Sequence, residues 1–163
     1  MTQVRPIVYR STRYGFTLQI PGWWRPYICT SGIGRSRETE AEYHFRFKYK
    51  GRAYDDVFAL LVFRLSRREW LESYGDSPYV YISEQDGRVF AYVTPEELPE
   101  AFIDKKTGEY DFKRFGTAIA LLKRMVNRDV PLIAKTLRFR RGGLALPSAP
   151  FRSRKVRWRN AGW

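Results

Sequence analysis

Few side chains in this sequence could carry nucleophilic or acid–base chemistry, because its 163 residues include one cysteine and one histidine. Cys29 and His44 would have to form any Cys–His nucleophile pair. Nothing recognisable around Cys29 activates its thiol, which favours a structural cysteine, buried or half-buried. His44 stands between Glu42 and Arg46 in an alternating segment. A Glu–His pair could transfer protons, but the alternation favours a solvated His44 with partners on neighbouring strands.

Metal and cofactor sites are also poorly represented. One cysteine excludes an internal disulfide framework and a cysteine-based zinc site, and one histidine excludes a multi-histidine metal centre. The segment 30–37 has two glycines, hydroxyl groups and two arginines, which superficially suit a phosphate. It lacks the Lys-Ser/Thr ending of a P-loop and the third glycine of a dinucleotide loop, so a flexible connection is favoured. We therefore predict no cofactor, no metal and no catalytic residue, and hence a protein that is not an enzyme.

Positive charge gathers at the C-terminus of a chain whose formal net charge is +13. From Arg138 onward there are eight basic residues and no acidic one, which leaves +5 for residues 1–137. The end of this segment mixes cations with aromatic residues and suits nucleic acid, anionic lipid or an acidic protein surface. A solvated chain end is the simpler alternative. The candidate polyanion-binding residues are Arg152, Arg154, Lys155, Arg157, Trp158, Arg159 and Trp163.

The clearest structural pattern is an alternation of period two over residues 38–49, which predicts a long strand with one solvated and one buried face. The segment 45–49 interleaves aromatic and basic residues, as RNA-binding sheets do, but the alternation assigns its aromatic side chains to the core. Residues 57–63 are apolar on both faces, as expected of a central strand covered from both sides. The residues expected on the solvated face are Glu38, Glu40, Glu42, His44, Arg46 and Lys48.

Local signals predict the remaining elements. Of the adjacent Trp23 and Trp24, one is expected to cover a core edge and the other to lie at the surface or against another segment. An amphipathic helix is expected to begin at Asp111 and to end near 128–129, before Pro131. The other expected elements are strands at 14–20, 27–33 and 136–139, a capped helix after Ser66, a hairpin of 79–84 with 88–93, and a short helix from Thr94.

These elements predict an α+β fold, with a central antiparallel sheet of about five to seven strands flanked by a long C-terminal helix and short helices. The length allows one domain of ordinary size. We place this domain at residues 1–141 and assign 142–163 to a linker and a basic aromatic tail.

The order of the landmarks resembles a group of small, largely uncharacterised Gram-positive bacterial domains with a PsbP-like α/β architecture. The resemblance covers roughly residues 12–139. It is carried by Tyr14-Gly-Phe-Thr-Leu-Gln-Ile-Pro21 with Trp23 close behind, a charged strand, an apolar strand and a Tyr-rich hairpin. It closes with a long helix that runs into Asp129-Val130-Pro-Leu-Ile-Ala-Lys-Thr-Leu-Arg-Phe139. The resemblance implies an antiparallel sheet flanked by helices, with binding and assembly roles and no catalytic residues to transfer.

These observations favour a non-enzymatic binding or assembly module, for a protein or a small ligand, with a basic tail. The alternative is a nucleic-acid-binding protein that acts through backbone electrostatics, and an enzyme with an unrecognised site is less favoured. The expected partners are an unknown protein or a polyanion held by the tail.

No apolar run approaches the roughly 18 residues of a transmembrane helix. The N-terminal residues lack a secretory signal, which predicts a cytoplasmic protein on the chain as given, or an exported one if a signal was removed.

Overall fold

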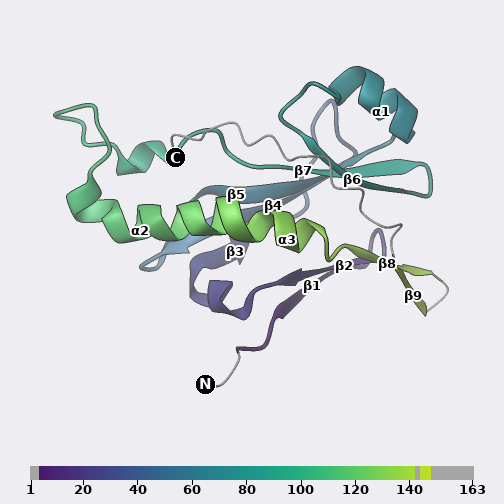
Figure 1. Cartoon of the computed structure of the whole chain (residues 1–163), viewed down its shortest axis with the longest axis horizontal. Helices are drawn as coiled ribbons and strands as arrows, with labels where there is room; N and C mark the ends of the chain where they lie inside the picture. The colour runs from purple at the N-terminus through teal and green to yellow at the C-terminus, as the bar shows by residue number, and fades with distance from the viewer. Residues whose placement is uncertain (1–3, 142–143, 148–163) are drawn as a thin grey trace.

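The computed structural model describes residues 4–141 and 144–147, which form an α+β fold with two antiparallel sheets (Figure 1). In the described residues the larger sheet has five strands in the order β3-β4-β5-β7-β6, and the smaller has four in the order β1-β2-β8-β9. The predicted α+β class is confirmed. The sequence analysis predicts a single central sheet, whereas the described residues form two sheets. The strands are β1 (Ile7–Ser11), β2 (Phe16–Ile20), β3 (Ile28–Thr30), β4 (Ala41–Tyr49), β5 (Arg52–Phe63), β6 (Val80–Gln85), β7 (Arg88–Val93), β8 (Arg138–Arg141) and β9 (Leu144–Pro147).

The larger sheet separates two apolar cores. In β4 the odd-numbered side chains from Ala41 to Phe47 are buried, as the alternation predicts, and Phe45 stacks on Phe58 of β5 with ring centroids 4.5 Å apart. The central strand β5 is buried on both faces, which confirms the two-sided pattern of residues 57–63. Its large-core residues include Phe58, Leu60 and Val62, and its small-core residues are Ala59, Leu61 and Phe63.

The small core lies beneath α1 (Arg67–Tyr74), whose Trp70 is buried against the sheet. The predicted capping box starts this helix. The Ser66 hydroxyl accepts a hydrogen bond from the Glu69 amide at 3.2 Å, and the Glu69 carboxylate accepts one from the Ser66 amide at 3.0 Å. Both orphan amide donors are thereby satisfied at the first turn.

The large core lies between the five-stranded sheet, the small sheet and the long helical segment. In Figure 1 this segment crosses in front of β4 and β5, and α1 lies at the upper right beside β6 and β7. The segment begins with α2 (Phe112–Arg124), capped by Asp111, whose carboxylate accepts from the Arg114 amide at 3.0 Å. The spacing predicts an apolar stripe from Phe112 to Val126. Ile119, Leu122, Met125 and Val126 are buried as expected, whereas Phe115 is half-buried and Phe112, at the first position of α2, is 60% exposed.

The expected helix end before Pro131 is wrong, since a π-helical turn at Met125–Asp129 continues α2 into α3 (Val130–Ala134). In this turn the Val130 amide bonds to the Met125 carbonyl, so the hydrogen-bond register is shifted. Pro131 then falls in the first turn of α3, where a missing N–H costs little.

The π-helical turn also directs the Asp129 carboxylate into the core, where it accepts a 2.8 Å hydrogen bond from the Trp24 indole N–H. Trp24 is fully buried, whereas Trp23 is half-buried beneath the Arg124 guanidinium at 4.5 Å. The predicted division of roles between the two adjacent tryptophans is confirmed.

Three further differences from the sequence expectations concern element boundaries. Strand β1 is not among the predicted elements, and β9 pairs with β8 inside the range predicted as a linker. The short helix expected from Thr94 is wrong: a 3₁₀ turn forms at Glu100–Phe102 instead. A helix begun at Thr94 would need an N–H from Pro99, which has none.

The hairpin of β6 and β7 is as predicted, with Asp86 and Gly87 at positive φ.

Candidate anion-binding pocket

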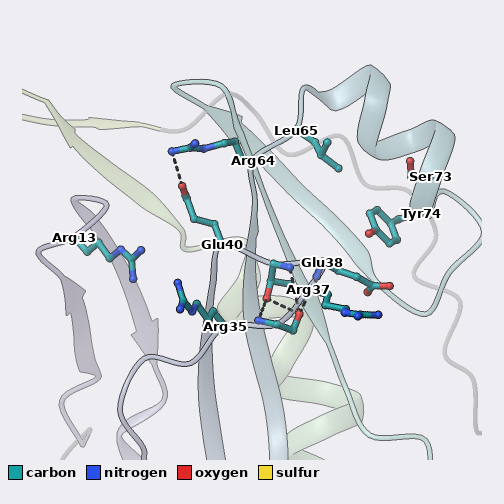
Figure 2. Close-up of a pocket in the computed structure, with 11 residues that line it drawn as sticks. Arg13, Arg35, Arg37, Glu38, Glu40, Arg64, Leu65, Ser73 and Tyr74 are labelled. Carbon is teal, nitrogen blue, oxygen red and sulfur yellow. Dashed lines mark hydrogen bonds and ion pairs between the residues drawn. The ribbon is translucent and has the colours of Figure 1, made fainter.

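A polar pocket of about 740 Å³ lies where the β1–β2 hairpin, the segment preceding β4, the end of β5 and α1 meet (Figure 2). Four arginines and two glutamates are among its lining residues. Figure 2 shows Arg13 and Arg35 pointing toward one another on one side, with Arg37 and Glu38 on the side of α1. The lining residues are Arg13, Arg35, Ser36, Arg37, Glu38, Thr39, Glu40, Arg64, Leu65, Ser73 and Tyr74.

Short-range hydrogen bonds define the course of the segment that carries Arg35 and Arg37. The hydroxyl oxygens of Ser36 and Thr39 lie 2.9 Å apart, and each accepts from the amide of the other residue, at 3.0 and 3.2 Å. Gly34 and Glu42 exchange two backbone hydrogen bonds, at 2.8 and 2.9 Å. Most of the segment 30–37 thus connects β3 to β4, in line with the connection that the sequence favours, and these hydrogen bonds hold the part from Gly34 onward.

Glu40 is the electrostatic centre of the pocket. Its carboxylate accepts two hydrogen bonds from Arg88, at 2.5 and 3.2 Å, and one from the Tyr14 hydroxyl at 2.9 Å. It also pairs with Arg64 at 3.2 Å. The hydrogen bonds from Arg88, with help from Tyr14 and Arg64, outweigh partial burial and lower the pKa of Glu40 to about 2. Burial and the hydrogen bond to Glu40 raise the pKa of Tyr14 to about 12.

The remaining arginines of the pocket are not neutralised in this way. Among the residues that the structure describes, Arg13, Arg35 and Arg37 form no ion pair, and Arg13 lies over the Tyr14 ring at 5.3 Å. Glu38 accepts a hydrogen bond from Tyr79 at 3.1 Å. The pocket is thus lined by three arginines without ion pairs, by Glu38, and by a Glu40 carboxylate that Arg64 and Arg88 already compensate. This arrangement attracts anions.

His44 lies outside the pocket, on the face of β4 opposite the large core. Its Nδ1 lies 2.6 Å from Asp56 and its Nε2 lies 3.0 Å from Glu42, and all three side chains are at most about one-third exposed. Burial opposes the charged imidazolium, but the hydrogen bonds and charges of Asp56 and Glu42 prevail and raise the pKa of His44. Both ring nitrogens lie against carboxylates, so neither is free to act as a base toward another molecule.

No hydrogen bond joins the two residues considered for a Cys–His pair, since both ring nitrogens of His44 lie against Asp56 and Glu42. Cys29 of β3 lies opposite Arg46, whereas His44 lies opposite Ala59 of β5. The aromatic side chains of Phe45 and Phe47 are fully buried, as the sequence predicts, and are therefore not available for base stacking.

Sequence reasoning missed the pocket because its residues come from separate elements. Arg13, Arg64 and Tyr74 belong to a hairpin turn, a strand end and a helix, and none of them stands in a local motif. The arginines of 30–37 were the one available signal. The tail candidates between Arg152 and Trp163 lie outside the described residues and stay predictions.

A comparison of the chain with protein-family models, curated proteins and solved structures finds no match. The resemblance to PsbP-like Gram-positive domains therefore stays a prediction. The described residues contain no group of three or more His, Cys, Asp or Glu that could hold a metal ion. None of the helices in the described part of the chain has the length and apolar character needed to span a bilayer.

Proposed function

We propose that this protein is a non-enzymatic binding module that holds a small multivalent anion, bearing phosphate or carboxylate groups, in the arginine-lined pocket. The observation that carries this proposal is that Arg13, Arg35 and Arg37 line one pocket without carboxylate partners among the described residues, with Arg13 and Arg35 pointing toward one another. Like charges held together are unfavourable, and a bound anion with two or more charges relieves their repulsion.

The dimensions and chemistry of the pocket agree with such a ligand. Its volume of about 740 Å³ lies in the range of small-molecule sites. Guanidinium groups bind phosphate and carboxylate through paired hydrogen bonds, and the Ser73 and Tyr74 hydroxyls on α1 add neutral polar groups. The PsbP-like resemblance, with its binding and assembly roles, is consistent with the same function.

The proposal is tested by thermal denaturation and calorimetric titration with pyrophosphate, inorganic phosphate and citrate. Sodium chloride at matched ionic strength is the reference. A ligand at 100 times its Kd should stabilise the protein by about 2.7 kcal/mol. Arg35→Ala and Arg13→Ala should each raise the Kd by about ten-fold or more, because a hydrogen bond to a charged group contributes about 1.5–3 kcal/mol.

Arg52→Ala is the matched control, because Arg52 is an exposed arginine outside the pocket that contacts the Tyr54 ring at 5.1 Å. Its Kd should equal that of the wild type. Equal responses to all three anions and to sodium chloride, or equal affinities of Arg35→Ala and Arg52→Ala, would refute the proposal.

A further inference from the structure

The acidic residues of this protein are confined to the middle of its sequence. All 17 Asp and Glu residues lie between Glu38 and Asp129. The first 37 residues hold six arginines and no acid, and residues 130–163 hold nine Lys and Arg and no acid. The middle of the chain is therefore close to neutral, and the two ends carry the net positive charge.

The fold joins these two acid-free ends in one sheet. Strands β1 and β2 come from the first end, β8 and β9 come from the second, and β2 pairs with β8. The inward side chains of this sheet, such as Phe16 and Phe139, are buried in the large core. The opposite face is not covered by α2 or α3, which contribute to the same large core.

Arginines dominate this outer face. Arg10, Thr17 and Arg138 stand opposite one another on β1, β2 and β8, and Arg140 follows Arg138 by two residues on the same strand face. All three arginines are exposed. Strand spacing places Arg10 and Arg138 about 10 Å apart, and Arg138 and Arg140 about 7 Å apart along the strand. Arg138 also donates to the carbonyls of Lys135 and Leu137, which orients its guanidinium.

We infer that this outer face, formed by Arg10, Thr17, Gln19, Arg138 and Arg140, binds the phosphate backbone of a nucleic-acid duplex without reading its bases. Arginine with threonine and glutamine is a usual set of phosphate-contacting side chains. The described part of the face carries no aromatic side chain on which unpaired bases could stack, so a duplex is favoured over a single strand.

The same face is poorly suited to a membrane or a protein partner. In the described strands, the large apolar side chain on this outer face is Val8, which is 44% exposed. An interfacial membrane site needs several apolar or aromatic anchors, and a protein interface needs an apolar centre. In the sequence, the residues after β9 include five more cations, between Arg152 and Arg159, and no acid.

The test is fluorescence anisotropy with a 20-base-pair DNA duplex of random sequence, with the full-length chain, at several salt concentrations between about 50 and 200 mM. Each lost phosphate contact lowers the logarithmic salt slope for a duplex by about 0.9. Arg10→Ala/Arg140→Ala should therefore flatten the slope by about 1.8 and weaken binding by about ten-fold at 100 mM salt. The tail cations are present in every variant, so the difference reports on the sheet.

The control variant Arg52→Ala/Arg68→Ala removes the same charge from two exposed arginines of β5 and α1, and should change the slope by less than about 0.5. Equal slopes for the two double variants, preference for the single strand, binding confined to anionic vesicles, or no binding at 50 mM salt would each overturn the inference. Arg10→Ala/Arg140→Ala should still bind pyrophosphate like the wild type, which separates this surface from the pocket.

Discussion

Replacing Glu40 tests the electrostatic core of the pocket, because this one carboxylate holds Arg64, Arg88 and Tyr14 together. Its pKa falls from an ordinary 4.5 to about 2 in the folded protein. At 1.36 kcal/mol for each pKa unit, this difference corresponds to about 3.4 kcal/mol. Solvent reaches the cluster, since the Arg64 side chain is 76% exposed, so we expect Glu40→Gln to cost about 1.5–2 kcal/mol at pH 7.

The dependence on pH has a definite sign. Because the folded pKa of Glu40 lies below the unfolded one, its stabilising contribution is complete above about pH 4.5 and is lost as the pH falls toward 2. The difference in unfolding free energy between wild type and Glu40→Gln, measured by urea denaturation, should therefore shrink over this interval. It should be constant between about pH 6 and 8.

Glu72→Gln is the matched control. Glu72 pairs with Arg68 at 3.4 Å on α1, where the two side chains are 68% and 90% exposed, so its loss should cost less than about 0.5 kcal/mol. Equal destabilisation by the two substitutions, or a Glu40→Gln effect that does not change between pH 4.5 and 2, would refute this account. If the pocket binds anions, Glu40→Gln should also tighten pyrophosphate binding, because it removes a negative charge and frees Arg64.

Three other substitutions test the surrounding structure. His44→Ala should reduce the unfolding free energy, measured by urea denaturation, more at pH 6 than at pH 9. The pKa of His44 is raised in the folded protein, so its charged form stabilises the fold below about pH 6.5, and this contribution is lost as the pH rises through the folded pKa. Trp24→Phe should reduce the unfolding free energy by about 2–4 kcal/mol, measured by thermal denaturation, because it leaves the buried Asp129 carboxylate without its N–H donor. A loss below about 0.5 kcal/mol would contradict a stabilising role for this hydrogen bond. Phe45→Asp should prevent folding as judged by circular dichroism, whereas Arg46→Ala, at a half-buried position on the opposite face, should cost about 1 kcal/mol or less.

The elements that could be predicted from the sequence are those with local physical causes. The capping box at Ser66 joins residues three apart, and the Asp86-Gly87 turn needs only its own positive φ angles. The alternation in β4 places its odd-numbered side chains in the core wherever the strand lies, because successive side chains of a strand point to opposite faces. Such signals are independent of the rest of the chain.

Glu40 shows where this reasoning stops. The alternation of residues 38–49 assigns Glu40 to a solvated face, so the sequence pattern alone does not distinguish it from any other surface glutamate. Its partners Tyr14 and Arg88 are 26 and 48 residues away in sequence, in the β1–β2 turn and in β7, and only the tertiary fold brings them within hydrogen-bond distance. No local pattern encodes such contacts, since the chain between them can close in many ways before the sheet forms.

The charge distribution shows the same division between sequence and fold. The sequence alone determines that both ends of the chain lack acidic residues. The pairing of β2 with β8 determines that these ends share a sheet, and the burial of Phe16 and Phe139 determines which face the arginines take. Because an apolar face must leave water while a guanidinium must stay in it, tertiary packing places arginines from two separate basic segments on one exposed sheet face.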